Sequence, residues 1–217
     1  MKRIGILISL LLFGFVSFAQ EEIVEDANFF VNKGNKALQD KDYAGAYENY
    51  SKALGILKEE GVIDTSMTYN TGYCAYKEKK YEEATPYLEE SAQLGYKEEM
   101  PYMLLMACYL KTSDLEAGEA IAQKSIAKYP DNEKLQELAA KIYLKKGLVF
   151  FKKGNAIKKA ANESGLNTTD PEAFKAEYEK ANVEYRKALP FFEEAYKYDP
   201  GKMLNIALNQ IILKSQI

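Results

Sequence analysis

The sequence predicts an all-α chain in which antiparallel helix pairs stack one after another. Gly34 lies twelve positions before Ala46, and Ala46 lies four positions before Tyr50. The same two intervals run from Gly72 to Ala84 and on to a large apolar residue. Small residues at such positions let two helices approach closely. The distance along the chain from Gly34 to Gly72, which begin the two patterns, is typical of an array of repeated helical units.

The stretch around Gly72 resembles the tetratricopeptide repeat (TPR), a helix-turn-helix unit of about 34 residues. The resemblance rests on Asn70-Thr71-Gly72-Tyr73-Cys74-Ala75-Tyr76, Tyr81-Glu82-Glu83-Ala84 and Leu88. It implies a TPR-type right-handed solenoid of antiparallel helix pairs, and it extends over nearly all of residues 20–217. Because this scaffold hosts many partners, the resemblance is specific for fold and not for function.

Residues 1–19 have the composition of a secretory signal peptide. Lys2 and Arg3 are followed by an apolar run over 4–15 and by small residues at Ser17 and Ala19. The alternative is a retained membrane anchor, but the run is short for crossing a bilayer, which needs about 20 apolar residues. We therefore expect cleavage after residue 19 and an exported protein, periplasmic or secreted.

Four repeats are expected in the domain at 20–217. The interval from Gly34 to Gly72 exceeds the length of one repeat by four positions, so residues 61–64 are expected to form a longer turn between repeats. In repeat one, helices are expected over 27–39 and 43–58. The expected repeats are 27–60, 65–98, 99–132 and 133–200.

The last repeat is expected to contain a helical insertion. Ala140 matches the first small position, but the second is found only at Ala188, four times as far along the chain as in the earlier repeats. Residues 141–161 and 171–198 keep a helical composition on either side of a polar turn, which predicts an elongated last hairpin. A C-terminal capping helix over about 202–215 is expected to cover the apolar end of the stack.

The large apolar residues at matching positions are expected to share one continuous core. Burial of each is worth roughly 1.5–3 kcal/mol. These residues are Phe30, Tyr50, Leu88, Tyr109, Tyr143 and Phe192. Cys74 and Cys108, one repeat apart, are expected to be buried free thiols, because equivalent positions in stacked repeats lie farther apart than the roughly 7 Å that a disulfide allows.

Composition argues against several chemistries. The chain has no histidine, which removes histidine-based triads and histidine metal ligands, and two cysteines are too few for a metal site. Adjacent glutamates on a helix point about 100° apart and do not converge on one substrate. The sequence therefore predicts neither an enzyme nor a metal or cofactor site. A net charge of −3 gives no general attraction to nucleic acid.

The TPR resemblance implies a partner-binding groove lined by the first helix of each repeat. Tyr69, Tyr73 and Tyr76 are spaced so that they share one helix face. Tyrosine suits recognition because it joins an apolar ring to a polar tip. The alternative is that some of these rings are ordinary core. The groove carried over by register comprises Asn35, Leu38, Tyr69, Tyr73, Tyr76, Lys77, Met103, Leu110 and Lys111.

A second candidate surface consists of lysines spaced seven apart. Lys145, Lys152 and Lys159 are expected on one side of the long helix, where they could contact an anionic partner or lipid head groups. The alternative is a solvated face partly neutralised by glutamates of the facing helix, namely Glu172, Glu177, Glu179 and Glu184.

The sequence as a whole predicts an exported scaffold that binds a protein or peptide in its concave groove. The alternative is a structural subunit of a cell-envelope assembly, in which the long hairpin or the cap makes permanent contacts. A nucleic-acid partner is not expected, and the sequence does not specify an oligomeric state.

Overall fold

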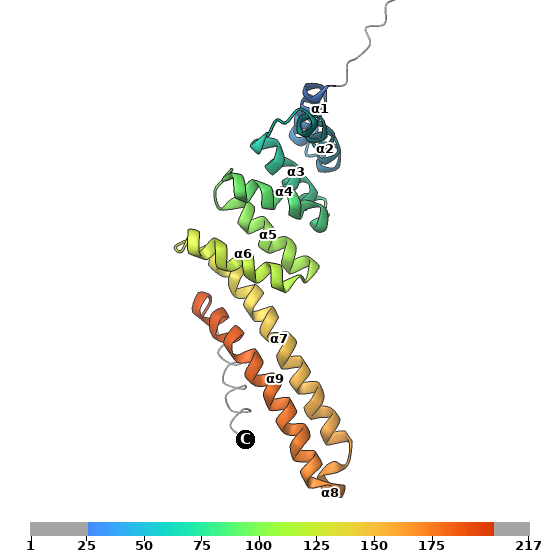
Figure 1. Cartoon of the computed structure of the whole chain (residues 1–217), viewed down its shortest axis with the longest axis vertical. Helices are drawn as coiled ribbons and strands as arrows, with labels where there is room; N and C mark the ends of the chain where they lie inside the picture. Colours follow the sequence, from blue (N-terminus) through green and yellow to red (C-terminus); the bar gives the residue numbers. More distant parts are fainter. Residues whose placement is uncertain (1–25, 202–217) are drawn as a thin grey trace, which may run out of the picture.

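The computed structural model describes residues 26–201 as a stack of helix pairs that ends in a long hairpin (Figure 1). The helices are α1 Ala27–Gln39, α2 Tyr43–Glu59, α3 Thr65–Lys77, α4 Tyr81–Leu94, α5 Met100–Thr112, α6 Leu115–Lys128, α7 Glu133–Glu163, α8 Leu166–Thr169 and α9 Pro171–Tyr198. Pairs α1/α2, α3/α4 and α5/α6 follow one another, and α2, α4 and α6 each pack against the first helix of the next pair. The predicted fold class is confirmed for this part of the chain. The expected signal peptide and capping helix lie outside the described residues.

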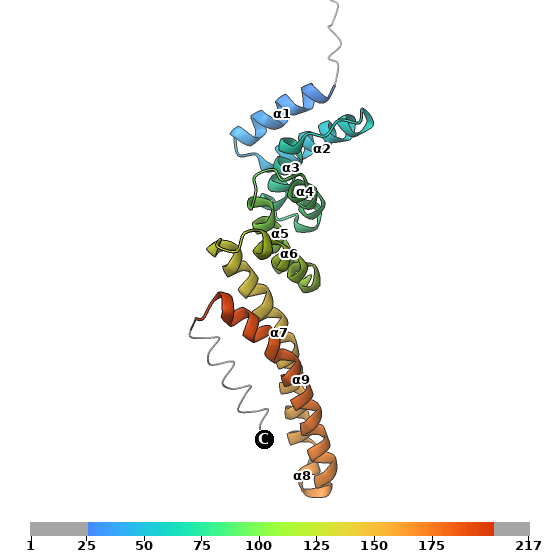
Figure 2. The ribbon, with the colours of Figure 1, turned by 60° about the vertical axis from the view of Figure 1, so that its left-hand side comes forward.

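The elongated hairpin consists of α7 and α9, joined by the single turn α8. Figures 1 and 2 both show α7 and α9 side by side over their length, with the end nearest α8 extending well beyond α1–α6. The helix α7 runs for 31 residues and α9 for 28, against 13 to 17 for the helices of the stack. The stack and its projection thus present two separate regions of surface.

Aspartate caps set where many of these helices begin. An N-terminal helix turn leaves backbone N–H groups without partners, and a carboxylate one residue before the helix accepts from them. In α1, α2, α3, α6 and α9 the cap accepts a hydrogen bond from the N–H three residues later, at 2.8–3.1 Å. The caps are Asp26, Asp42, Asp64, Asp114 and Asp170.

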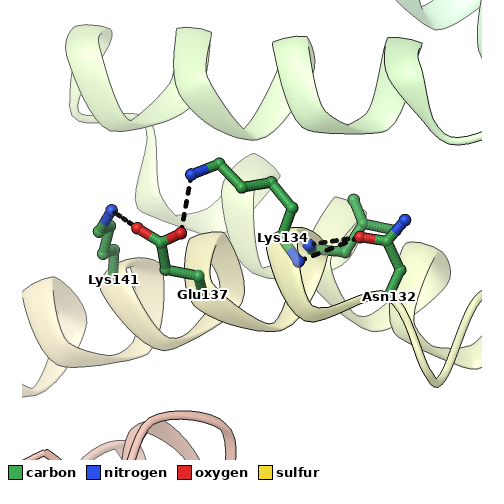
Figure 3. A network of polar contacts seen from close by, with 5 residues as sticks. Asn132, Lys134, Glu137 and Lys141 are labelled. Atoms are coloured by element: carbon green, nitrogen blue, oxygen red, sulfur yellow. Dashed lines mark hydrogen bonds and ion pairs between the residues drawn. The ribbon is translucent and has the colours of Figure 1, made fainter.

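The helix α7 begins with an amide cap, which two exposed ion pairs follow one turn later (Figure 3). The Asn132 side chain accepts from the backbone N–H groups of Lys134 and Leu135, each at 3.1 Å. One turn on, the Glu137 carboxylate lies between the ammonium groups of Lys134 and Lys141. Hydrogen bonds from Lys134, which has the larger effect, and from Lys141 lower the pKa of Glu137 to about 2. All three side chains are solvent-accessible, so the pairs add little stability.

Glycines mark where the two helices of a repeat cross. A Cβ added to Gly34 would lie 2.7 Å from the Tyr50 ring, and one added to Gly72 would lie 2.9 Å from Leu88 Cγ. Real Cβ atoms do not approach other atoms so closely, so only glycine permits these crossings. This confirms the predicted role of the repeated small residue in repeats one and two.

The same crossing recurs twice along the long hairpin. A Cβ on Gly147 would lie 2.9 Å from the Phe192 ring, and one on Gly154 would lie 2.6 Å from the Tyr185 ring. The two glycines are seven residues apart, and so are the two rings. Because two helical turns take about seven residues, successive crossings stay on one face of each helix. The hairpin therefore extends the helix contact of a single repeat.

An asparagine after the glycine completes this crossing in two places. The Tyr50 hydroxyl donates to Asn35 Oδ1 at 2.8 Å, beside Gly34. The Tyr185 hydroxyl donates to Asn155 Oδ1 at 2.8 Å, beside Gly154. Each ring is thereby held at both its face and its tip, which fixes its position against the glycine.

The register expected for the last repeat is wrong by one such interval. The sequence assigns Ala140 to the small position that pairs with Ala188 and Phe192. The structure instead places Gly147 against Phe192. A shift of seven residues keeps the same helix face towards the partner, so the apolar pattern of α7 alone does not distinguish Ala140 from Gly147.

Within residues 26–201 the buried apolar residues form two clusters, where the sequence predicted one continuous core. Phe30 and Tyr50 belong to the cluster of the first repeat, whereas Leu88, Tyr109, Tyr143 and Phe192 belong to that of the later ones. Two half-buried tyrosines, Tyr47 and Tyr73, pack against both clusters. The core divides here because the residues at this junction are tyrosines that keep part of their side chains at the surface.

The two cysteines are free and fully buried, as predicted. Cys74 lies in the first cluster and Cys108 in the second. Burial raises the pKa of each thiol to about 12, because the thiolate would lose its hydration. Both therefore act as small apolar core residues at neutral pH.

Candidate protein-binding surface

The tyrosines of α3 do not share one environment. Tyr69 is only 6% exposed, its ring is stacked on Tyr73 at 6.2 Å between centroids, and Tyr96 lies against it at 5.7 Å. Tyr96 belongs to the segment after α4, which covers this part of the helix. The prediction that Tyr69 lines the groove is therefore corrected: Tyr69 is a core residue.

Tyr73 and Tyr76 keep part of their side chains exposed on successive turns of α3. Tyr73 meets the ring of Tyr43 edge-on at 6.0 Å, and Tyr76 meets Tyr81 at 5.8 Å. Burial of the rings raises the pKa of both Tyr73 and Tyr76. At neutral pH their hydroxyl groups are therefore protonated and can donate hydrogen bonds.

Lys77 extends this surface with a positive charge. Its side chain is exposed, and its ammonium lies 5.1 Å from the ring centre of Tyr43 and 6.0 Å from that of Tyr73. Contacts of this kind are worth about 0.5–1 kcal/mol at exposed sites. Tyr43, Tyr73 and Lys77 thus form one group at the end of α3.

Tyr43 and Tyr81 were missed by sequence reasoning. Both open the second helix of their repeat, and both follow the repeat glycine by nine residues. Each packs against a tyrosine of α3. That shared position was the signal that could have placed them at the edge of the surface.

The groove residues predicted on α5 all keep at least part of their side chains accessible to solvent. Met103 and Leu110 are half-buried and pack against the larger core cluster, whereas Lys111 is exposed. On α1, Leu38 is half-buried against the first cluster. Asn35 is exposed, but its Oδ1 atom accepts the hydrogen bond from the Tyr50 hydroxyl. This side chain therefore stabilises the contact between α1 and α2.

Lys145 is not free for an anionic partner. Its ammonium donates to the backbone oxygen of Leu110 at 2.7 Å and to Ser113 Oγ at 3.0 Å. It thereby satisfies the Leu110 carbonyl in the last turn of α5, where a cation is favourable. Lys77, Lys111 and Lys145 recur at intervals of one repeat, so Lys145 occupies in the last repeat the position that Lys77 and Lys111 occupy in theirs.

Lys152 and Lys159 are exposed on α7, away from α9. Lys152 lies two residues before Gly154, which faces α9, and two residues are about 200° around a helix. Lys159 follows Lys152 by seven residues and so lies on the same side. Lys152 and Lys159 therefore lie on a solvated face, as the alternative expected. The expected neutralisation by glutamates of the facing helix is found for their neighbour Lys153, whose ammonium lies 3.1 Å from Glu184 of α9.

Three hollows among the described residues lie away from this surface. One of about 480 Å³ lies between α6, α7 and α9, a second of about 460 Å³ between α2, α3 and α4, and a third of about 440 Å³ between α1 and α2. No residue of the predicted groove lines any of the three. The candidate site is thus separate from these three hollows.

Residues 26–201 contain neither a candidate membrane span nor a candidate metal site. No helix there combines the length and the apolar character that a membrane crossing needs. No group of three or more cysteine, aspartate or glutamate side chains is arranged to hold a metal ion in that part of the chain.

Solved structures similar to this chain include TPR proteins. A TPR repeats protein from Bacteroides fragilis matches with a TM-score of 0.50 and 25% identity, over 88% of this chain and 99% of that one. The chain has the TPR fold. YrrB, described as a TPR protein with an unusual peptide-binding site, matches with a TM-score of 0.46 and 19% identity, over 88% and 94% of the two chains. No family model and no curated protein sequence matches.

Proposed function

We propose that this TPR protein is exported and binds a protein or peptide on the open face formed by α3 and α5. The observation that carries the proposal is the pair of half-buried tyrosines on successive turns of α3, Tyr73 and Tyr76, flanked by exposed lysines. Side chains of this kind recur at the centres of protein interfaces, because a ring gives a large contact area at a small cost in conformational entropy.

The chemistry of the surface favours a partner with apolar and acidic groups. The exposed parts of Tyr73 and Tyr76, with Met103 and Leu110, offer apolar area and tyrosine hydroxyl donors. Lys77 and Lys111, one repeat apart, add two positive charges. The methionine suits partners whose side chains vary, because its unbranched side chain adapts its conformation.

A structural role in a cell-envelope assembly is the second candidate. The observation that favours it is the hairpin of α7 and α9, which projects beyond the stack (Figure 2). A permanent contact on the hairpin would leave the α3–α5 face unused. The two functions therefore differ in which residues matter for binding.

Affinity capture with matched variants tests the first proposal. Residues 20–217 would be used as bait in cell-envelope extract, beside the variant Tyr76→Ala/Lys77→Ala/Lys111→Ala. We expect a captured partner to be retained at least about ten-fold less by the variant, since loss of interface anchors costs more than about 1.4 kcal/mol. Tyr73 is left intact because it joins the two core clusters.

The control removes the same residue types elsewhere: Lys58→Ala/Lys124→Ala/Tyr196→Ala. All three side chains are exposed and lie on α2, α6 and α9. Circular dichroism establishes that both variants are folded. Equal retention of the partner by the native chain and the α3–α5 variant would reject the proposed site.

A further inference from the structure

The projecting part of α7 has one face that no helix of the described chain covers. Both views show α9 along one side of α7, and the hairpin beyond the stack has no other neighbour among α1–α6 (Figures 1 and 2). Gly147 and Gly154 face the rings of α9. The opposite face, about 200° around the helix, is formed by Val149, Lys152, Ala156 and Lys159.

This outward face combines an apolar side chain with small residues. Val149 is 54% exposed, more than either of the other large exposed apolar residues of the hairpin, Val183 and Tyr196. Ala156 and Ala160 are also exposed, farther along the same helix. Small residues beside a valine allow another helix to approach closely and to bury the valine.

The charge of the face is positive. Lys152 and Lys159 are exposed and lie two turns apart. The Glu163 carboxylate lies 3.8 Å from the Lys159 ammonium, and the side chains of Lys159 and Glu163 are 76% and 67% exposed. Such an exposed pair is worth little, so Lys159 can exchange Glu163 for another carboxylate.

We propose that this outward face of α7 binds an acidic amphipathic helix of a partner protein. Carboxylates of the partner helix spaced about seven residues apart would meet Lys152 and Lys159, and an apolar residue between them would cover Val149 and Ala156. The proposal stands apart from the function assigned to α3 and α5, since no residue is shared between the two surfaces.

The positive charge of this face favours an acidic partner helix over two other occupants, the chain's own C-terminal segment and an anionic membrane. Residues 202–217 contain Lys202 and Lys214 and no acidic residue, so the chain's own C-terminal segment is not complementary to the face. Basic segments that hold a protein on an anionic membrane carry about 4–8 lysines or arginines, at about 1 kcal/mol each. Two available lysines fall well short of that number.

The test is titration of the mature chain into a fluorescent acidic helix. The probe would be a designed peptide of about 21 residues with glutamate at every seventh position and a leucine–alanine seam beside it. Fluorescence anisotropy should show saturable binding that weakens as salt rises from about 0.05 M to about 0.5 M. The charge reversal Lys152→Glu/Lys159→Glu should weaken binding at least about ten-fold.

The matched control is Lys124→Glu/Lys175→Glu, which reverses two exposed lysines away from this face. It should bind the probe nearly as the native chain does. An equal loss in both variants would mean non-specific attraction, and no loss in the Lys152/Lys159 variant would place the helix elsewhere; either result overturns the proposal.

Two parallel measurements separate other occupants. Phosphatidylglycerol vesicles that bind the native chain and not the Lys152/Lys159 variant would assign the face to lipid. A native dimer that becomes a monomer in this variant by light scattering would assign it to a second copy of the chain. Each of these outcomes would overturn the assignment to a partner helix.

Discussion

The substitution Phe192→Ala is expected to lower the free energy of unfolding by about 3–5 kcal/mol, the largest effect of any single change considered. Phe192 is fully buried, and its ring fills the space that the missing side chain of Gly147 leaves open. Removing the ring from a glycine crossing leaves a cavity that neither helix can close. Urea denaturation followed by circular dichroism measures the loss.

Tyr196→Ala is the matched control for this change. It removes an aromatic ring from the same helix one turn later, but the side chain of Tyr196 is 38% exposed. Its loss should cost about 1 kcal/mol or less, as for surface substitutions. Equal costs for Phe192→Ala and Tyr196→Ala would show that the crossing at Gly147 does not anchor the hairpin.

The substitution Gly154→Val is expected to destabilise the hairpin by about 1–3 kcal/mol, although valine favours a helix more than glycine does. A Cβ at this position would lie 2.6 Å from Tyr185 Cε1 and 3.1 Å from the backbone oxygen of Ala181. Tyr185 is fully buried and its hydroxyl is bonded to Asn155, so the ring cannot move aside easily. Thermal unfolding should show a lowered Tm.

Gly55→Val separates crowding from helix propensity. Gly55 lies inside α2, is exposed, and has no atom within 4 Å of its added Cβ. Valine there should leave stability unchanged or raise it by a few tenths of a kcal/mol. If Gly154→Val proved as harmless as Gly55→Val, the close contact between α7 and α9 at this point would be disproved.

Much of the fold was predictable because the positions of glycines show where two helices approach closely. The interval from Gly34 to Tyr50 identified the first crossing, and α1 occupies the residues expected for it. The last repeat was harder, because Ala140 and Gly147 share one face of α7. A stronger signal was present in the recurrence of Gly34-Asn35 at Gly154-Asn155, each opposite a tyrosine.

The candidate surface was less predictable because exposure depends on distant segments. Spacing placed Tyr69, Tyr73 and Tyr76 on one helix face, but Tyr69 is covered by Tyr96, which comes from beyond the next helix. Lys145 likewise places its charge at the C-terminus of α5, through a contact with Leu110 that is distant in sequence. Neither contact follows from the local pattern.

Hydrogen–deuterium exchange on the complex with a captured partner locates the binding face. We expect slower exchange on partner binding in α3 and α5, residues 65–77 and 100–112, because a bound chain on their open face shields these helices from solvent and suppresses their local opening. Exchange in α2 and α4 should change less, because only their first residues, Tyr43 and Tyr81, reach the edge of this face. Protection confined to the hairpin of α7 and α9, with α3 and α5 unchanged, would contradict the proposed binding face.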